Sequence, residues 1–287
     1  MPTYGTDVEH PSKVLASLNF RPRKERGQSF LADGNVARKI VEQVRPDGEF
    51  IVEVGPGLGA LTFLLEGRAR AIRAVEIDQT LAGYLRGEIG EAGVEVIVAD
   101  FLKLKEEVFA SWRREASGGV KVVGNLPYSI SGPLVFRFVE LRDYLSSCHV
   151  MLQKEVARRL ASSPGGKEYG SSSVILQAVA GVKVLFSVSR NCFYPVPEVD
   201  SSFLEIDFSA GGEWEIRDFR VFSGLVNAAF SGRRKVIRNA LGPHLASLGV
   251  RGRDRVERLL EEARISPGDR PERVAVENFV TLANLIA

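Results

Sequence analysis

Four consecutive residues, Asn125-Leu126-Pro127-Tyr128, bring together groups that suit a planar amine. They follow an apolar run at residues 120–123 that reads as a buried strand. The turn would present the side-chain carbonyl of Asn125, the backbone carbonyl of Pro127 and the ring of Tyr128 at one end of that strand. Two hydrogen-bond acceptors beside an aromatic face can hold an amine attached to a flat ring. Taken alone, the same residues could equally form a turn with its tyrosine in the core.

An earlier apolar run leads into a turn that is rich in glycine, with Gly55, Gly57 and Gly59 at alternate positions and Glu53 two residues before them. A strand-to-helix turn without Cβ atoms lets a ligand lie against the backbone and its free N–H groups. The G-x-G-x-G spacing differs from the G-x-G-x-x-G of dinucleotide oxidoreductases. It is more typical of methyltransferases that use S-adenosylmethionine (SAM), so the turn predicts a SAM cradle.

Carboxylates end the next two expected strands. Glu76 closes the apolar run at residues 71–76, and Asp100 follows the run at 94–98. Open α/β sheets bind their ligands at the carboxyl ends of the strands. We expect Glu76 to accept hydrogen bonds from the ribose hydroxyls of the cofactor and Asp100 from its adenine amine. Either carboxylate alone could be a helix cap or a solvated turn residue, but their succession after neighbouring strands favours binding.

The chemistry that these groups suit is methyl transfer to an adenine amine. Transfer from a sulfonium needs an in-line nucleophile and a dry, oriented site, and it needs no metal. Acceptors at Asn125 and Pro127 would hold both N–H bonds and favour a more tetrahedral nitrogen. Tyr128 could stack on a base that has been taken out of its helix. Phe193, in an extended segment with two prolines, could cover the other face of the base or could lie in the core.

The remaining sequence alternates between strand and helix patterns. Such alternation predicts right-handed βαβ units, a mostly parallel sheet and therefore an α/β, Rossmann-like methyltransferase domain. We expect strands at residues 50–54, 71–76, 94–98, 120–123, 149–152, 183–188 and 202–208, helices at 34–44, 58–65, 80–89 and 154–161, and a loop at 163–173. Helical patterns alone follow, at 219–230, 235–241, 253–263 and 274–285. We expect a catalytic domain at 1–210 with an N-terminal arm, and a small all-α domain at 211–287.

Composition and charge point to a partner that is a nucleic acid. The 287 residues are 45% hydrophobic and 26% charged, which is ordinary for a globular protein. Residues 12–45 hold 8 Lys and Arg against 3 acidic residues, and residues 217–258 hold 10 against 3, whereas residues 47–110 are acidic. No apolar stretch has the length of a membrane span, and residues 1–19 lack the core of a secretory signal. Two cysteines in no metal-ligand pattern favour a reducing cytoplasm.

The motifs together resemble one family, the ribosomal RNA adenine dimethyltransferases, and within it the small-subunit branch. Besides the glycine turn and the Asn-Leu-Pro-Tyr turn, the resemblance includes residues 23–31, 153–157, 164–170 and 193–201 and the basic run beginning at Arg233. It implies a SAM-dependent enzyme, with S-adenosylhomocysteine as its product and no metal. It implies dimethylation of two adjacent adenosines near the 3′ end of small-subunit rRNA, within a precursor subunit.

The resemblance also assigns roles to residues. Those implied for the cofactor are Gln28, Ser29, Leu31, Gly55, Gly57, Gly59, Glu76, Ile77, Asp100, Phe101 and Asn125. Those implied for the reaction are Asn125, Pro127, Tyr128 and Phe193, and those expected to contact RNA phosphates are Arg233, Arg234, Lys235 and Arg238. Ser29 stands where relatives often carry Asn or His. We expect a monomer that acts without a membrane.

Other functions share some of these features. The large-subunit branch of the family, whose activity gives macrolide resistance, has the same core motifs, but the loop at 164–170 and the basic helical domain argue against it. A DNA adenine methyltransferase would need a target-recognition insert that the sequence lacks. A non-catalytic assembly factor could bind immature subunits through the basic segments, but the intact Asn125 and glycine turn favour catalysis.

Overall fold

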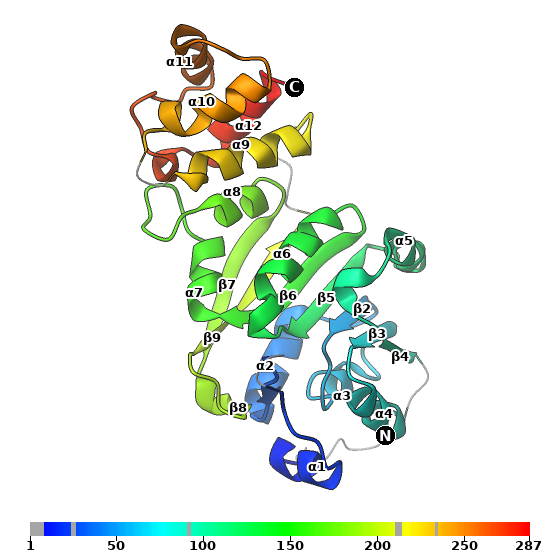
Figure 1. Ribbon diagram of the computed structural model, residues 1–287. Helices are drawn as coiled ribbons and strands as arrows, with labels where there is room; N and C mark the ends of the chain where they lie inside the picture. The colour runs from blue at the N-terminus through cyan, green and yellow to red at the C-terminus, as the bar shows by residue number, and fades with distance from the viewer. Residues whose placement is uncertain (1–8, 24–26, 91–92, 210–213, 233–234) are drawn as a thin grey trace. The chain divides into compact units, whose positions relative to one another are not determined.

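The computed structural model describes residues 9–23, 27–90, 93–209, 214–232 and 235–287. The larger sheet has seven strands in the order β4-β3-β2-β5-β6-β9-β7 (Figure 1). The strands are β2 (Phe50–Val54), β3 (Ala71–Glu76), β4 (Val94–Val98), β5 (Val120–Asn125), β6 (Leu145–Gln153), β7 (Gly181–Val188) and β9 (Ser201–Asp207). A separate two-stranded sheet pairs β1 (Phe30–Leu31) with β8 (Phe193–Tyr194) in antiparallel register.

The strand order confirms the expected Rossmann-like sheet. β2 pairs in parallel with β3 on one side and with β5 on the other, while β6 and β9 are antiparallel. The chain therefore changes direction across the sheet between β2 and β5. At such a switch point the connections leave in opposite directions, which opens a crevice at the carboxyl ends of these strands.

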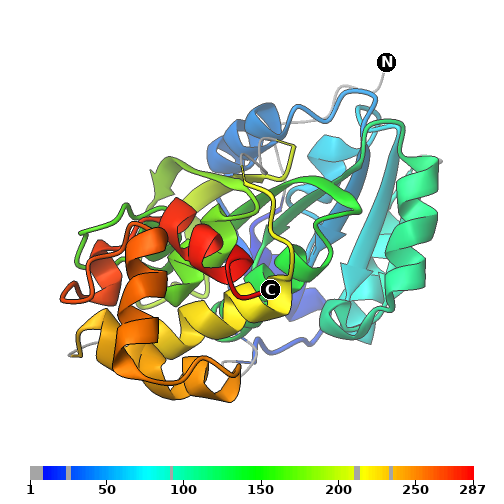
Figure 2. The same cartoon turned by 90° about the horizontal axis from the view of Figure 1, so that it is seen from above.

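Helices cover both sides of the strands (Figure 2). Those of this part of the chain are α1 (Pro11–Ser17), α2 (Gly34–Val44), α3 (Thr62–Leu65), α4 (Gln79–Glu88), α5 (Glu106–Glu115), α6 (Ser131–Glu140) and α7 (Lys154–Leu160). Side chains of α2, α3 and α4 share one buried apolar cluster with alternate residues of the strands, including Ile51 and Ile72. Phe109 of α5 and Phe138 of α6 each make an edge contact with Phe101, which follows β4.

Two expectations for helices were wrong in detail. The helix expected at 58–65 covers only Thr62–Leu65, because Gly57 and Gly59 have φ values of 58° and 79°, outside the helical region. Helices α1, α5, α6 and α8 (Ser171–Gln177) were not expected, although α5 has an amphipathic pattern that buries Phe109 and Trp112. α8 begins within the loop expected at residues 163–173.

The chain forms two compact units whose boundary differs from the single break expected after residue 210. One unit holds residues 1–157 and 183–207, and the other holds 158–182 and 208–287. The second unit contains α8, α9 (Phe219–Ser231), α10 (Ile237–Ser247), α11 (Arg253–Glu262) and α12 (Val276–Asn284). Tyr169 explains why the segment at 158–182 belongs there. Its ring is buried beside Phe230, and its hydroxyl donates to the Val274 carbonyl at 3.2 Å.

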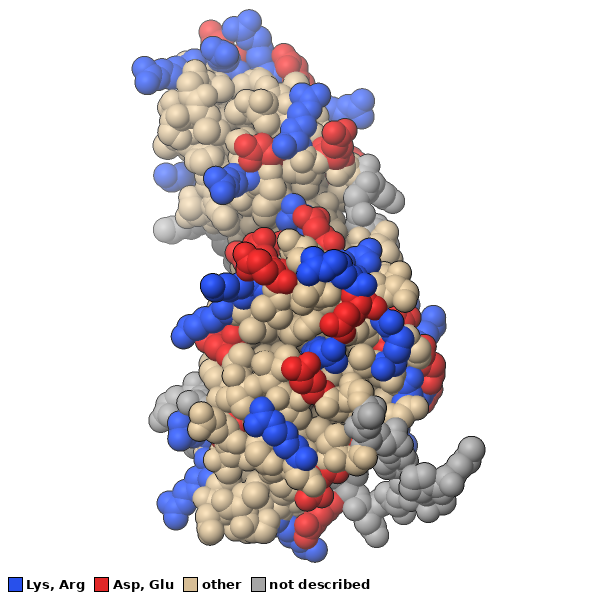
Figure 3. Space-filling model, turned by 90° about the vertical axis from the view of Figure 1, so that its right-hand side faces the viewer, with Lys and Arg blue, Asp and Glu red and all other residues tan. Residues whose placement is uncertain are grey.

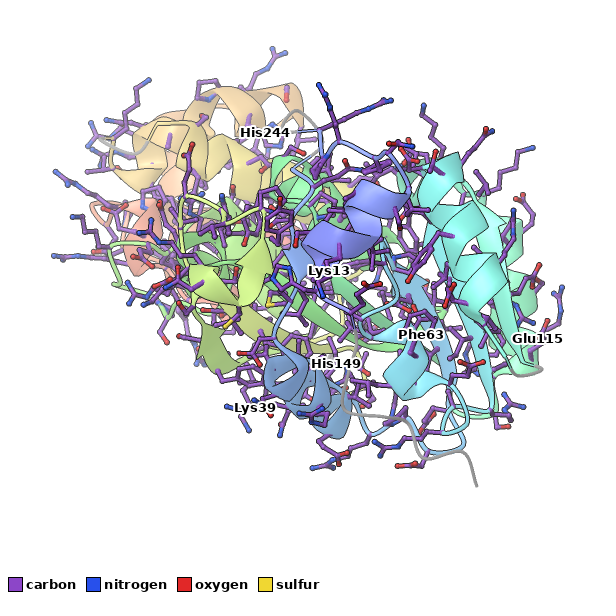
Figure 4. The ribbon with its side chains drawn as sticks, turned by 90° about the horizontal axis from the view of Figure 1, so that it is seen from below. Lys13, Lys39, Phe63, Glu115, His149 and His244 are labelled. Carbon is purple, nitrogen blue, oxygen red and sulfur yellow. The ribbon has the colours of Figure 1, made fainter. Side chains whose placement is uncertain are left out.

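A histidine is buried within the sheet of the first unit, His149 of β6, which Figure 4 labels. Its Nε2 lies 3.4 Å from a carboxylate oxygen of Glu205 on β9. Burial lowers the pKa of His149, and the Glu205 carboxylate opposes that shift. The imidazole is therefore neutral near pH 7 and contributes stability that is lost as the pH falls below about 6.5.

No helix in the described part of the chain is long and apolar enough to cross a membrane. On the face shown in Figure 3, lysine and arginine side chains are interspersed with carboxylates and form no single patch.

Gly124, beside Asn125 in β5, allows β2 and β5 to approach closely. A Cβ atom at Gly124 would lie 2.6 Å from the Val54 carbonyl oxygen. Because that neighbour is backbone, we expect Gly124→Ala to destabilise the protein by about 1–3 kcal/mol, which corresponds to a fall in Tm of several degrees. Gly132→Ala is the matched control: nothing lies within 4 Å of its added methyl, and α6 should tolerate or gain from it. Equal melting temperatures of the two variants would contradict this account.

Candidate active site

The glycine turn follows β2 directly and takes a left-handed backbone at three positions. Gly55, Gly57 and Gly59 have φ values of 66°, 58° and 79°, which residues with a Cβ rarely adopt. An added Cβ at Gly55 would meet nothing within 4 Å, so this position faces open space. The backbone at Gly55 is thus accessible to a ligand.

The other two glycines have different neighbours. A Cβ at Gly57 would lie 3.0 Å from the Phe30 ring, which lines the pocket with it. A Cβ at Gly59 would lie 2.5 Å from Phe63 and 2.8 Å from Leu85. Gly59 is outside the pocket lining, and its role in this arrangement is to let the turn pack closely on those two side chains.

Glu76 ties the glycine turn to the next strand. One carboxylate oxygen accepts from the Gly57 N–H at 3.1 Å, and the other accepts from the Asp78 N–H at 2.9 Å. The side chain is buried, and burial raises the pKa of Glu76 although the two N–H donors oppose that shift. Each carboxylate oxygen can accept a further hydrogen bond, so the group suits a pair of neighbouring hydroxyls.

A second buried carboxyl lies beneath the same turn. Glu53 of β2 accepts a hydrogen bond from the Thr62 hydroxyl at 2.7 Å. Burial raises the pKa of Glu53 to about 7; the Thr62 hydrogen bond opposes this increase and the nearby charge of Glu76 adds to it. The sequence pattern marked Glu53 only as part of the glycine motif, and its contact with Thr62 depends on α3.

Asp100 follows β4 at the pocket and has local partners too. One carboxylate oxygen accepts from the Leu102 N–H at 3.1 Å, which caps the short helix at Phe101–Lys103, and the other lies 3.6 Å from Lys103. Capping and ligand binding are compatible because a carboxylate has several acceptor positions. Ile77 is 51% exposed and lines the pocket, so its side chain offers an apolar surface to a ligand. Phe101 is a buried residue of the lining.

Asn125 is oriented by the N-terminal segment. Its Nδ2 donates to the Ser29 carbonyl oxygen at 2.8 Å. A carbonyl oxygen can only accept, so this bond fixes which end of the amide faces Ser29. Among the residues that the structure describes, Oδ1 has no hydrogen-bond partner, so Asn125 offers an acceptor at the pocket that it lines, as holding an amine requires.

The rest of the Asn-Leu-Pro-Tyr turn is also anchored. The Tyr128 hydroxyl shares a 2.6 Å hydrogen bond with the Ser201 hydroxyl, and burial raises the pKa of Tyr128, which keeps the phenol protonated. The Pro127 carbonyl accepts from the Ile130 N–H at 3.1 Å, so only its second lone pair remains for an amine. Pro127 and Tyr128 both line the pocket.

The N-terminal residues implied by the resemblance lie at the same pocket. Gln28 accepts from the Arg23 N–H at 2.8 Å, and Ser29 donates from its hydroxyl to the Pro195 carbonyl at 2.8 Å. Leu31 is buried and lies opposite Phe193 in the β1–β8 pair. Phe193 is 2% exposed within the apolar core and outside the pocket lining, so in this arrangement it has the core role and no free face for a base.

One pocket collects nearly all of these groups. The pocket is lined by these residues that the sequence had singled out: Gln28, Ser29, Leu31, Gly55, Gly57, Glu76, Ile77, Asp100, Phe101, Asn125, Pro127 and Tyr128. Sequence reasoning did not single out its further apolar lining, which includes Phe30, Leu58, Leu61, Val75, Leu81, Leu126, Ile130 and Leu134. Phe30, Leu58 and Leu126 lie within the motifs and the others lie nearby in sequence, and only the fold turns these side chains toward a common space.

Within the described ranges, no group of three or more His, Cys, Asp and Glu side chains is arranged to hold a metal ion.

The candidate RNA-binding residues belong to the second unit. Arg233 and Arg234 lie outside the described residues. Lys235 is exposed, whereas Arg238 is 28% exposed and lies 2.6 Å from Glu257 of α11. Arg253 also contacts Glu257, and hydrogen bonds from Arg253 and Arg238 lower the pKa of that carboxyl. Arg238 therefore links α10 to α11.

The fold and the pocket define a methyltransferase of the Rossmann-like class. A dimethyladenosine transferase from Plasmodium falciparum has the same fold, with a TM-score of 0.72 at 20% identity over 88% of this chain and 95% of that one. The 23S rRNA methyltransferase ErmE superposes with a TM-score of 0.68 at 27% identity, over 89% of this chain and 98% of that one.

The chain belongs to the ribosomal RNA adenine dimethylase family, whose profile matches residues 19–287. It is 36% identical over 285 residues to the ribosomal RNA small subunit methyltransferase A of Bacillus cereus (strain AH187) and to that of Bacillus anthracis (strain CDC 684 / NRRL 3495). Each match covers 98% of this chain and 97% of the relative. The expected family is confirmed.

The raised pKa of Glu53 has a consequence for stability. The unfolded carboxyl titrates near 4.5 and the folded one at about 7, so the folded protein binds the extra proton between these values. The free energy of unfolding therefore falls as the pH rises from 4.5 to 7 and changes little from this group above 7. We expect Glu53→Gln to be more stable than wild type at pH 8 by up to about 3 kcal/mol, with the difference vanishing near pH 4.5. Denaturant unfolding at both pH values measures this.

Glu261→Gln, an exposed substitution in α11 with the same change of charge, is the control. Its effect should be small and independent of pH. A Glu53→Gln variant whose gain in stability is the same at pH 4.5 and pH 8 would show that Glu53 does not hold a proton in the folded protein.

Proposed function

We propose that this enzyme uses SAM to dimethylate the exocyclic amines of two adjacent adenosines near the 3′ end of small-subunit rRNA. The observation that carries the proposal is the orientation of Asn125. Its Nδ2 is held by the Ser29 carbonyl, and its Oδ1 is left as an acceptor at a pocket that also contains the glycine turn.

The residues at the pocket fit the cofactor. The open left-handed Gly55 can accept a ligand against its backbone, Glu76 has acceptor positions for two ribose hydroxyls, and Ile77 presents an apolar surface for a purine ring. When bound, SAM supplies an electrophilic methyl group on a sulfonium. We assign the cofactor contacts to the expected residues except Gly59, whose contribution is the packing of the turn.

The chain's own contribution to the reaction is to hold and orient the target amine. Asn125 Oδ1 and a backbone carbonyl of the turn accept its two N–H bonds, which favours a nitrogen lone pair directed out of the ring plane. Tyr128 stacks on the extracted base, and its ring position is fixed through the hydroxyl bond to Ser201. The apolar lining excludes water, so the amine meets the methyl group without competition from solvent.

Small-subunit rRNA is the proposed substrate because the relatives that match at 36% identity over nearly the whole chain are named for it. ErmE, which acts on 23S rRNA, shares the fold at lower identity. We further propose that the substrate is a precursor small subunit in the cytoplasm and that the enzyme acts as a monomer.

The proposal is tested by methyl transfer from labelled SAM to purified, unmodified small and large ribosomal subunits, with mass spectrometry of the product nucleosides. Dimethyladenosine in the small subunit alone is the expected result. Dimethyladenosine in the large subunit would assign the enzyme to the other branch of the family. No product in either subunit, with SAM bound, would favour an assembly factor without catalysis.

Substitutions at Asn125 test the role of its amide. We expect Asn125→Ala to lose methyl transfer by about 10²-fold or more, because an acceptor for the amine is missing, while SAM still binds. Asn125→Asp keeps an acceptor but sets two oxygen acceptors against each other at the Ser29 carbonyl, so it should also be inactive and less stable. Single-turnover rates and calorimetric SAM affinities measure both effects. Near-normal turnover of Asn125→Ala would remove the amide from the mechanism.

Basic side chains of the second unit provide a third test. We expect Lys235→Gln to weaken binding to small subunits and to reduce the slope of log affinity against log salt by about one, as the loss of one phosphate contact does. Arg238→Gln should instead lower Tm more than it changes that slope, since Arg238 is paired with Glu257. Filter binding at several salt concentrations separates the two roles. An unchanged slope for Lys235→Gln would show that this lysine is directed away from RNA.

A further inference from the structure

An exposed aromatic and apolar surface lies next to the pocket, on the segment that follows Phe193. β8 directs Phe193 into the core and Tyr194 outward, as alternate strand residues do. Tyr194 is 37% exposed and Val196 is 56% exposed, values that are high for side chains of this kind. We call these two side chains the Tyr194 platform.

The segment that carries the Tyr194 platform is linked to the Asn-Leu-Pro-Tyr turn by hydrogen bonds at both of its ends. At one end the Ser29 hydroxyl donates to the Pro195 carbonyl at 2.8 Å, and the carbonyl of the same Ser29 accepts from Asn125. At the other end Ser201 shares a hydrogen bond with the hydroxyl of Tyr128. Phe30, which lines the pocket, lies opposite Tyr194 in the β1–β8 pair. The segment that carries the platform is therefore bonded to two residues of the pocket lining, Ser29 and Tyr128.

The ring of Tyr194 is held in position by the N-terminal segment. The His10 ring lies 5.6 Å from it, centroid to centroid, at an interplanar angle of 68°. His10 Nδ1 is in turn 2.7 Å from the Ser12 hydroxyl at the start of α1. Figure 4 shows α1, which carries the labelled Lys13, beside the segment that contains β8. A T-shaped contact of this kind restrains the tyrosine ring.

We propose that the Tyr194 platform binds the nucleotide next to the adenosine being methylated, by stacking of its base on Tyr194 and apolar contact with Val196. This rests on the proposed function, because it requires an RNA substrate. When one base is taken out of its helix, its neighbour loses a stacking partner, and an aromatic side chain at the entrance can replace it. Stacking contacts the π face of a base and not its hydrogen-bonding edge. The platform therefore contributes affinity for the RNA and fixes its register, with little preference for sequence.

Kinetics with unmodified small subunits test the proposal in the full-length enzyme. We expect Tyr194→Ala to raise KM for the subunit about fivefold or more, with kcat within about twofold of wild type. Tyr194→Phe retains the ring and should restore a normal KM. Val184→Ala, at another exposed apolar residue of the same unit, is the control and should leave KM unchanged. SAM affinity by calorimetry should be the same in all four proteins, which a merely structural defect at the pocket would not allow.

A second substrate tests the stacking partner itself. In subunits reconstituted with an abasic nucleotide beside the target adenosines, wild type and Tyr194→Ala should have the same KM, because the platform has no base to hold. A KM for Tyr194→Ala that matches wild type on normal subunits would overturn the proposal. So would an equal loss on normal and abasic substrates. If Tyr194→Ala is unfolded, Val196→Ser gives the same comparison at a more exposed side chain.

Failure of the platform and failure of the proposed function give different results. Binding of small subunits, measured by filter retention, compares wild type with Tyr194→Ala without turnover. Suppose that Tyr194→Ala binds small subunits more weakly than wild type but wild type makes no dimethyladenosine. The proposed reaction would then be wrong, and the proposed RNA contact of the platform would stand. Equal binding while wild type methylates the subunit would overturn the platform alone.

Discussion

The hydrogen bond from Asn125 to the Ser29 carbonyl is the contact on which the arrangement of the site depends. It selects one orientation of an amide whose two ends have opposite hydrogen-bonding character, and it leaves the acceptor end at the pocket. Ser29 belongs to the N-terminal segment and also binds the Pro195 carbonyl through its side chain. Ser29 thus links the N-terminal segment to the Asn-Leu-Pro-Tyr turn and to the segment that carries the Tyr194 platform. The Ser29 hydroxyl therefore has a structural partner here.

The cofactor end of the pocket is built on buried carboxyl groups. Burial raises the pKa of both Glu53 and Glu76, and the charge of Glu76 raises the pKa of Glu53 further. The Thr62 hydroxyl and the backbone N–H groups of Gly57 and Asp78 offset part of that cost. Glu53 holds a proton beneath the turn below about pH 7. Glu76 is the carboxyl group of the two that accepts from the Gly57 N–H of the turn. The turn is therefore held in shape before any cofactor arrives, at some expense in stability near neutral pH.

The second unit shows that charge in a sequence does not specify its use. Residues 217–258 are strongly basic, yet Arg238 and Arg253 both contact Glu257. The Arg238 contact joins α10 to α11, and the Arg253 contact lies within α11. An arginine paired in this way stabilises a helical packing and has fewer donors left for a phosphate. Lys235 is exposed and remains the candidate for RNA contact among the described residues of the basic run. Arg238 is thus assigned to helix packing and Lys235 is the candidate for RNA recognition, although the two residues are close in the sequence.

The local sequence determined the strands of the first unit and several of its helices, and it marked the candidate residues at the strand ends. Short apolar runs followed by Gly55, Glu76, Asp100 and Asn125 were enough to predict a parallel sheet, a glycine turn and functional groups at the strand ends, because a strand's end and a turn's glycines are local properties. Tertiary structure alone decided the rest. It placed Phe193 in the core and Tyr194 at the surface, joined residues 158–182 to the C-terminal helices, and paired Asn125 with Ser29. These outcomes depend on contacts between segments far apart in sequence, and no periodicity or spacing within either segment encodes which partner it meets.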